Sequence, residues 1–296
     1  MTDAAEFRRH SQDALARGNL DLAVAYLQTA LRQDPADRES YHTLGRLLRL
    51  AGRGDSAAAW YKACLHRYPD DSVARMGLAA LGQGPAPDRL PDDVVLYIFD
   101  RNANVYETNM EGLAYRIPET LTPMLAAEKG TARGDLDILD LGCGSGWCGP
   151  LLRPFARRLV GLDLSPAMLD LARAKNAYDE LVEGEILGAL QGGRLGTFDA
   201  IVAANVVLYF GKLEPLAEAI TKSLKPSGAF VFDVEKGATD RAEFHSAGRF
   251  THGRQLLERV FAPPLYARSR IQETVMRTEA GRPVHALCCV ATAPST

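Results

Sequence analysis

Hydrophobic and polar positions in the first eighty residues repeat every 34 residues. Large side chains recur where two helices of a hairpin would pack, and small ones recur where their backbones would approach. This pattern predicts two helical hairpins, at about 5–37 and 39–71, followed by a polar-faced capping helix at 72–81. The matched pairs include Gly18 and Gly52, Ala23 and Ala57, Leu27 and Tyr61, Ala30 and Cys64, and Pro35 and Pro69.

The pattern changes after residues 82–90, which are rich in Gly and Pro and are typical of a linker. From there on, helical stretches alternate with short apolar runs at 137–141, 158–162, 198–203 and 229–233. Such alternation predicts βαβ units around a parallel sheet. The last two runs, 266–277 and 284–292, flank a turn and predict a hairpin that closes an antiparallel edge.

The 34-residue unit resembles the tetratricopeptide repeat. The resemblance implies an all-α module over 1–81, with two repeats and a capping helix, and a second domain over 91–296. Repeat arrays bind partners along their concave face. Two repeats offer only a short groove, so they could equally cover a substrate entrance or mediate dimerisation.

Composition and charge restrict the class of protein. Of the 296 residues, 47% are hydrophobic and 24% charged, which excludes wholesale disorder. A formal charge of −3 argues against a nucleic-acid partner. No apolar run reaches the roughly 18 residues needed to cross a membrane, and the polar start at 1–6 is unlike a signal peptide, so we expect a cytoplasmic protein.

Five cysteines are present, and their spacing does not predict a metal site. The number is odd, and the paired spacing of a zinc site is missing. Cys64 occupies a small-residue position of the repeat, which favours a packing role. Cys288 and Cys289 are adjacent on a predicted strand, so their side chains face opposite sides and cannot share an ion.

The segment 138–146 carries the most informative motif. A hydrophobic strand runs into glycines at 142, 144 and 146, a pattern that permits a tight turn and lets a ligand lie against bare backbone. Residues 144–149 also satisfy the G-x-G-x-x-G pattern, which alone is a weak signal for a dinucleotide. The rival ligand is S-adenosylmethionine, which has no phosphate.

Acidic residues near the strand ends favour the second ligand. Asp140 precedes the glycines, where a carboxylate can meet the ammonium of a methionine moiety. Asp163 ends the second strand, 17 residues after Gly146, and suits a bidentate grip on ribose hydroxyls. Glu185 and Ile186 end the third strand and offer an acid and an apolar side chain to an adenine amine and ring face.

Residues 91–296 resemble the class I S-adenosylmethionine-dependent methyltransferases. The resemblance rests on DLGCGSG, GLDLSPAML, FDAIVAANVVLYF and LKPSGAFVF. It implies a Rossmann-like α/β fold, with a parallel sheet and an antiparallel edge hairpin, and S-adenosylmethionine as cofactor. The cofactor residues that it implies are Asp140, Gly142, Gly144, Asp163, Leu164, Met168, Glu185, Ile186 and Asn205.

The whole chain resembles the predicted methyltransferases that contain tetratricopeptide repeats. In that group two further segments precede the glycine loop, matched here by FDRNANVY at 99–106 and AYRIP at 114–118, with Ala114 in place of the usual Gly. The resemblance implies a helical lid that brings Tyr106 or Arg116 near the cofactor carboxylate. The alternative is that these residues only pack the junction between domains.

The acceptor side carries fewer signals. Methyltransferases that act on adenine or amide nitrogens resemble one another in an (Asp/Asn)-Pro-Pro-aromatic tetrad. The corresponding segment Asn205-Val206-Val207-Leu208 lacks both prolines, so we do not expect that chemistry here. An amide is no base, so Asn205 is expected to hydrogen-bond cofactor or loop backbone. Candidate catalytic residues are His252, in a segment similar to one of the repeat-bearing relatives, and Tyr209. A loop histidine that is merely solvated is the alternative for His252.

These observations predict a methyltransferase that uses S-adenosylmethionine and moves the methyl group to a small molecule by in-line displacement. A carboxylate or hydroxyl oxygen is favoured as acceptor, with nitrogen as an option. One alternative is a protein methyltransferase that recruits its substrate through the repeats. Another is a non-catalytic adaptor that binds the same cofactor.

Overall fold

The computed structural model describes residues 4–296, so half of the polar start at 1–6 lies outside the described residues. Two compact units emerge from the contacts within the chain. The smaller comprises Met1–Pro87 together with Phe244–Arg249, and the larger comprises Asp88–Glu243 and Phe250–Thr296. The boundary after Pro87 falls inside the stretch 82–90, where the sequence predicts a linker.

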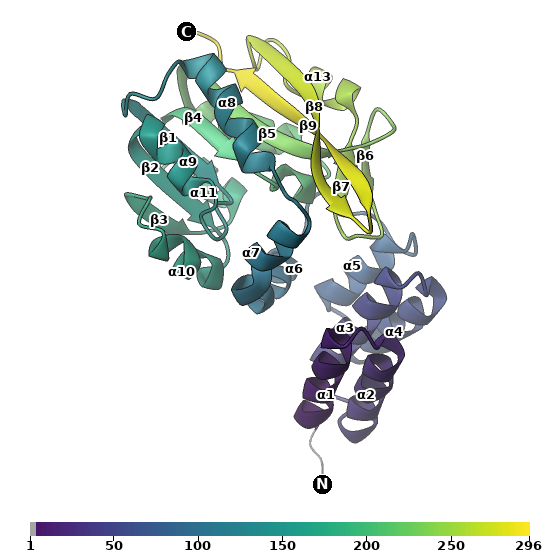
Figure 1. Ribbon diagram of the computed structural model, residues 1–296. Helices are drawn as coiled ribbons and strands as arrows, with labels where there is room; N and C mark the ends of the chain where they lie inside the picture. Colours follow the sequence, from purple (N-terminus) through teal and green to yellow (C-terminus); the bar gives the residue numbers. More distant parts are fainter. Residues whose placement is uncertain (1–3) are drawn as a thin grey trace. The chain divides into compact units, whose positions relative to one another are not determined.

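The smaller unit is a helical array in which each helix packs on the next (Figure 1). The ring of Tyr61 lies between neighbouring helices at the centre of its core. A Cβ added at Gly45 or Gly77 would lie 2.5 or 2.2 Å from that ring, so only glycine fits at these crossings. The helices are α1 (Ala4–Ala16), α2 (Leu20–Gln33), α3 (Arg38–Leu50), α4 (Gly54–Arg67) and α5 (Ser72–Ala80).

The larger unit is built on a mostly parallel sheet, with the order β3-β2-β1-β4-β5-β7-β6. The antiparallel hairpin β8–β9 joins it through β9, which pairs with β5. This confirms the predicted α/β sheet with its edge hairpin. The strands are β1 (Leu136–Leu141), β2 (Ala156–Asp163), β3 (Glu180–Glu183), β4 (Phe198–Ala203), β5 (Leu224–Lys236), β6 (Ala242–Phe244), β7 (Phe250–His252), β8 (Arg268–Glu279) and β9 (Arg282–Thr292).

Helices cover both faces of this sheet, as Figure 1 shows. Successive side chains of a strand alternate between the faces, so Leu139 belongs to one apolar core and Ile138 to the other. Cys289 and Cys288 divide in the same way, as expected from their adjacency. The helices are α6 (Asp92–Phe99), α7 (Ala103–Gly112), α8 (Ile117–Lys129), α9 (Gly149–Leu152), α10 (Pro166–Ala174), α11 (Ile186–Gln191), α12 (Glu214–Ser223) and α13 (Arg254–Val260).

Parallel strands place their carboxyl ends at one edge of a sheet, and ligands of open α/β sheets bind outside that edge. The neighbours β1, β2 and β4 pair in parallel there and end in Leu141, Asp163 and Ala203. The predicted cofactor residues follow these ends directly. Across residues 4–296, the helices are all too short or too polar to cross a membrane.

Candidate active site

The glycine loop follows β1 and turns tightly toward β2. Gly142 has φ +67°, and a Cβ added there would lie 2.5 Å from Cγ2 of Val206, so the backbone must be bare at this crossing. The N–H of Gly144 donates to Oδ2 of Asp163 at 2.8 Å. The α-helix after the loop, α9, has only four residues before a 3-10 turn at Arg153–Phe155.

Asp163 connects three pieces of the site. Besides the bond from Gly144, its Oδ1 accepts from the N–H of Ser165 at 2.9 Å. Ser165 in turn caps α10, because its Oγ accepts from the N–H of Met168 at 3.2 Å. Burial raises the pKa of Asp163, and the backbone N–H groups of Ser165, Gly144 and Leu164 oppose that rise. A carboxylate oxygen accepts two hydrogen bonds, so each oxygen retains capacity for a ligand.

Asp140 lies under the glycine loop and is 1% exposed. The hydroxyl of Tyr178 donates to its Oδ2 at 2.6 Å. Burial raises the pKa of Asp140 to about 7, the bond from Tyr178 lowers it, and the nearby charge of Asp163 raises it further. The carboxyl group is therefore poised between its two protonation states at neutral pH.

A pocket opens above the carboxyl ends of the strands and encloses about 720 Å³ of empty space, part of it open to solvent. A smaller recess of about 340 Å³, bordered by Asp140 and Ser145, shares Tyr106, Gly142 and Gly144 with it. The predicted residues that line the pocket are Tyr106, Gly142, Gly144, Asp163, Leu164, Met168, Glu185, Ile186, Asn205 and Tyr209.

Glu185 has a structural task that the sequence did not predict. It is the N-cap of α11, where its Oε1 and Oε2 accept from the N–H groups of Leu187 and Gly188 at 2.9 and 2.7 Å. Arg89 lies 3.8 Å from the same carboxylate. The cap fixes the rotamer of Glu185 at the pocket edge.

Asn205 is held in a left-handed backbone conformation, φ +61°. Its N–H donates to Oδ1 of Asp233 at 2.7 Å, which fixes the turn after β4. Burial raises the pKa of Asp233 to about 7, and this N–H and the charge of Arg277 oppose the rise. Within the described residues, the buried side-chain oxygen of Asn205 has no hydrogen-bond partner.

Helices α6 and α7 border the pocket as the predicted lid. Phe99 packs edge-on against Tyr209, with ring centroids 5.7 Å apart, and against Tyr106 at 6.1 Å. Burial raises the pKa of Tyr106, so its hydroxyl stays protonated. Glu107 anchors α7 to the glycine loop, because its Oε1 accepts from the hydroxyl of Ser145 at 2.6 Å.

Two predicted residues lie elsewhere. His252 is fully buried in β7, where its Nε2–H donates to the carbonyl of Phe210 at 2.8 Å, and burial lowers its pKa to about 4. It does not line the pocket, so the structure revises its role from proton acceptor to support for Phe210, which does. Arg116 is exposed at the N-cap of α8 and lines neither cavity, which leaves Tyr106 as the lid residue at the pocket.

The sequence did not predict the other residues that line the pocket. They come from the start of the larger unit and from the turn after β4, and they are Arg89, Leu90, Asp92, Val95, Phe99, Ala204, Val206 and Phe210. Leu90 reaches the site because its N–H donates to the carbonyl of Tyr209 at 2.9 Å. A pairing between segments about 120 residues apart leaves no local signal. The sequence also did not predict that Asp233 supports the turn at Asn205. The one signal for it was an acidic residue inside a buried, otherwise apolar strand.

The pocket fits S-adenosylmethionine better than a dinucleotide. A pyrophosphate is held by the N–H groups and dipole at the start of a helix, and a four-residue α9 supplies little of either. Asp163 is an acceptor suited to hydroxyl donors. Asp140, in the adjoining recess, adds a carboxyl group suited to a cation.

Comparisons with known proteins agree. Residues 139–232 match the methyltransferase domain family, and residues 8–72 match the tetratricopeptide repeat family. The chain therefore joins an S-adenosylmethionine-dependent methyltransferase domain to tetratricopeptide repeats. The methyltransferase domain contains the glycine loop, Asp163, Glu185 and Asn205, and the repeat match covers helices α1 to α4.

The methyltransferase domain is similar to enzymes with different acceptors. The malonyl-[acyl-carrier protein] O-methyltransferase of Acetivibrio thermocellus is 28% identical over 138 residues, 46% of this chain and 47% of that protein. The 18S rRNA (guanine-N(7))-methyltransferase of Bos taurus is 37% identical over 70 residues, 24% of this chain and 25% of that protein. The chain thus spans less than half the length of either relative.

A solved structure shows the same fold. The magnesium protoporphyrin IX methyltransferase of Synechocystis, solved with bound S-adenosylmethionine, matches 69% of this chain and 99% of its own, with a TM-score of 0.50 and 16% identity. At 16% identity, this similarity shows only that the two proteins share the Rossmann-like architecture.

Proposed function

We propose that the protein transfers a methyl group from S-adenosylmethionine to an oxygen atom of a small molecule. The observation that carries the proposal is one continuous pocket. It joins the cofactor residues Gly144 and Asp163 to an aromatic end formed by Phe99, Tyr209 and Phe210. When bound, S-adenosylmethionine supplies a methyl group already activated on a sulfonium.

The residues around the glycine loop would hold the cofactor. Asp163 would accept hydrogen bonds from ribose hydroxyls with the capacity that its two backbone bonds leave. Glu185 and Ile186 would bound the adenine, and Asp140 would face the ammonium of the methionine moiety from the adjoining recess. In-line displacement from an activated donor needs alignment and exclusion of water, which a preorganised apolar pocket provides.

The absence of a histidine among the described residues that line this pocket supports a carboxylate as the acceptor. Arg89 is the one cation among those lining residues, but it is paired with Asp92 and lies 3.8 Å from Glu185 at the adenine end, so it does not select the acceptor. A carboxylate is ionised at neutral pH and needs no general base. This suits a site in which His252 is buried against Phe210. The relative named as an O-methyltransferase also supports an oxygen acceptor.

Tyr209 would position the acceptor. Its side chain is half-buried at the pocket wall, and its backbone is fixed between Leu90 and Val206 by hydrogen bonds of 2.9 and 3.0 Å. An aromatic ring held in this way offers a flat apolar surface at low entropic cost.

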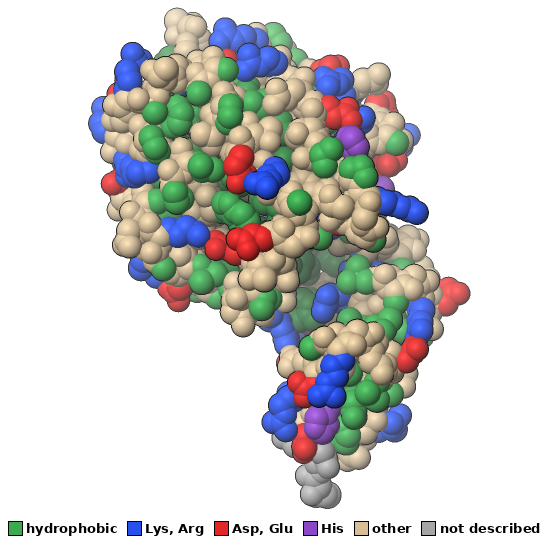
Figure 2. Space-filling model, in the orientation of Figure 1, with side chains coloured by type: hydrophobic (Ala, Val, Ile, Leu, Met, Phe, Trp, Pro, Cys, Tyr) green, Lys and Arg blue, Asp and Glu red, His purple; other side chains and the backbone are tan. Residues whose placement is uncertain are grey.

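The charge of the protein supports a small acceptor over a nucleic acid. The formal net charge is −3. On the face of the larger unit drawn in Figure 2, basic side chains of the described residues stand among acidic ones without forming a continuous stripe. Proteins that bind a phosphate backbone concentrate positive charge along its path.

The test is product formation from methyl-labelled S-adenosylmethionine in a cell extract fractionated by size. We expect label in the small-molecule fraction, in a compound that mild base converts back to a free carboxylate. Label in protein would support recruitment of a protein substrate through the repeats, and label in RNA would contradict the acceptor class. No label in any fraction, with S-adenosylhomocysteine bound, would support the adaptor.

Binding of S-adenosylhomocysteine is expected to weaken by about fivefold between pH 7 and pH 6. The pKa of Asp140 is raised to about 7, so acidification protonates it. The neutral acid attracts the ligand's ammonium less, and the ionised fraction falls from about one half to about one tenth over this range. Calorimetric titration at both pH values measures the effect.

Two variants locate that pH effect. Tyr178→Phe removes the hydroxyl that stabilises the Asp140 carboxylate, so it should raise the pKa and move the loss of affinity to higher pH. Asp140→Asn should bind more weakly at pH 7 and flatten the profile. Equal affinity of the wild type at pH 6 and 7 would show that Asp140 does not face the ammonium.

A further inference from the structure

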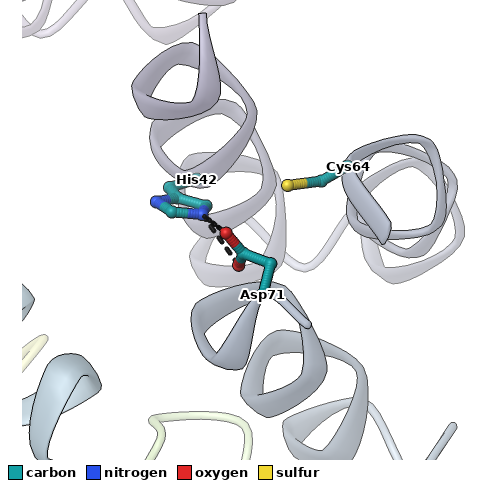
Figure 3. Close-up of side chains that lie close together, drawn as sticks. All are labelled: His42, Cys64 and Asp71. Atoms are coloured by element: carbon teal, nitrogen blue, oxygen red, sulfur yellow. Dashed lines mark hydrogen bonds and ion pairs between the residues drawn. The ribbon is translucent and has the colours of Figure 1, made fainter. Parts of the chain in front are cut away.

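Three side chains that ligate metals meet in the core of the smaller unit (Figure 3). His42 comes from α3, Cys64 from α4, and Asp71 is the N-cap of α5. Nε2 of His42 lies 2.9 Å from both carboxylate oxygens of Asp71, and the thiol of Cys64 points at the pair from the neighbouring helix. The nitrogen, the sulfur and a carboxylate oxygen all lie within 4.8 Å of one another, and the three residues are buried.

The first repeat holds a matching cluster in which only the aspartate is a metal-ligating residue. Thirty-four residues earlier, the corresponding positions are Arg8, Ala30 and Asp37. Arg8 donates to Oδ2 of Asp37 at 2.6 Å, and Asp37 caps α3 as Asp71 caps α5. In both repeats, therefore, a side chain of the first helix pairs with the aspartate that caps the helix following the repeat. What distinguishes the second is an imidazole in place of a guanidinium and a thiol in place of a methyl group.

We propose that His42, Cys64 and Asp71 bind a zinc ion, with a water or another small ligand completing the tetrahedron. Thiolate, imidazole and carboxylate are all zinc ligands, and a thiolate with an imidazole selects Zn²⁺ over hard cations such as Mg²⁺. Tetrahedral zinc holds such donor atoms about 3.3–3.8 Å apart. The three side chains therefore need only small shifts to receive the ion.

Binding changes the proton inventory of the cluster. Burial, and next the charge of Asp71, raise the pKa of the Cys64 thiol to about 12, so without metal it is neutral at physiological pH. On binding, zinc–sulfur, zinc–nitrogen and zinc–oxygen bonds form, and the thiol proton and the Nε2 proton of His42 are displaced. A neutral imidazole takes up one proton again at Nδ1, so one proton is released to solvent, whereas an imidazolium keeps its Nδ1 proton and two are released. No oxidation or reduction is involved. Arg38, whose Nε lies 3.6 Å from Asp71, places a positive charge that opposes the ion.

The ion would connect three helices of a short array. Repeat proteins are stabilised by the interfaces between neighbouring units, and about three repeats are usually needed for stability. The match to the repeat family covers only residues 8–72. Since zinc ligated by α3, α4 and the start of α5 adds a bond across that interface, it would raise the stability of this unit. This role is independent of methyl transfer.

The test is titration of Zn²⁺ into the untagged full chain after treatment with a chelator and dialysis. We expect one equivalent of Zn²⁺ to bind, release of one proton for a neutral His42 and two for an imidazolium, and a higher thermal midpoint for the helical unit. Co²⁺ serves as a spectroscopic probe, because a bound thiolate produces a sulfur-to-cobalt charge-transfer band. Arg38→Gln should tighten binding, since it removes the opposing charge.

Repeat 1 supplies the disabling substitutions. Cys64→Ala copies Ala30, and His42→Arg copies Arg8, so each places in repeat 2 a residue that repeat 1 accommodates. Each should weaken Zn²⁺ binding by about a hundredfold or more, because loss of a residue behind the ligands already costs about 10–100-fold. Cys64→Ala should also abolish the charge-transfer band, with helical circular dichroism retained.

Cys289→Ala is the matched control, because it removes a buried thiol from the larger unit. It should leave both Zn²⁺ affinity and the cobalt band unchanged. The proposal is overturned if the wild type binds no stoichiometric Zn²⁺, or if folded Cys64→Ala and His42→Arg variants bind it as the wild type does.

Discussion

Asp163→Ala is expected to weaken S-adenosylhomocysteine binding by about a hundredfold or more. Asp163 lines the pocket at the end of β2, where we propose that it accepts two hydrogen bonds from ribose hydroxyls. A hydrogen bond to a charged group contributes about 1.5–3 kcal/mol, and a factor of one hundred is about 2.7 kcal/mol. Isothermal titration of wild type and variant measures the difference.

The substitution also removes the acceptor for the N–H groups of Gly144 and Ser165. Part of the lost affinity therefore comes from a looser glycine loop. Asp163→Asn separates the two effects, because its one carbonyl oxygen keeps one backbone bond, so an intermediate loss is expected. Asp170→Ala, which removes an exposed acid of α10 paired with Arg173, should change affinity by less than about twofold. An unchanged dissociation constant in folded Asp163→Ala would place the ribose elsewhere.

Gly146→Ala is expected to destabilise the larger unit by about 3 kcal/mol. Gly146 has φ +79°, and a Cβ added there would lie 2.9 Å from Cα of Ala172 and 3.0 Å from the ring of Tyr178. The left-handed conformation costs a non-glycine residue about 1–2 kcal/mol, and overpacking costs about 1–3 kcal/mol. Since the obstacle is backbone of α10, the helix that follows Asp163 must shift.

The Gly196→Ala variant separates the packing part of that cost from the conformational part, because the difference between the two variants is the packing part. Gly196 has the same φ of +79°, and nothing lies within 4 Å of an added Cβ. The Gly196→Ala variant should therefore lose about 1–2 kcal/mol of its free energy of unfolding, which is the conformational part alone. Urea unfolding in a Trp60→Phe background measures both, because Trp147 is then the remaining tryptophan and reports on the larger unit. Equal losses for the two variants would show that the loop and α10 are not tightly packed.

Much of the fold could be predicted because its signals are local. The run at 198–203 coincides with β4, and the 34-residue period places five helices. Boundaries were less accurate where tertiary pairing extends a strand. β5 runs over Leu224–Lys236 rather than 229–233, because Leu224 pairs with Phe198 of β4 at one end and β9 pairs with Ala229–Glu235 toward the other. The helix after the glycine loop is one turn long, since α9 gives way to a 3-10 turn before β2.

The sequence predicted only the wall of the candidate site that lies at the carboxyl ends of the strands. Gly142, Gly144 and Asp163 are adjacent to strand ends, and such positions converge in a parallel sheet whatever the loops do. The other wall of the pocket depends on long-range pairing. Arg89 reaches the pocket through a bridge with Phe210, and β7 buries His252 under the same turn. Neither contact has a sequence period that would reveal it.

The sequence by itself determined the α/β domain, the repeats and the motif positions of the cofactor pocket, because hydrophobic periodicity and glycine spacing are encoded over short distances. Only the tertiary structure decided which side chains share a cavity and in what protonation state. It buried Asp140 against Tyr178 and set its pKa to about 7. It also brought His42, Cys64 and Asp71 together across three helices. Burial and contact between distant segments set these properties, and neither is a function of local sequence.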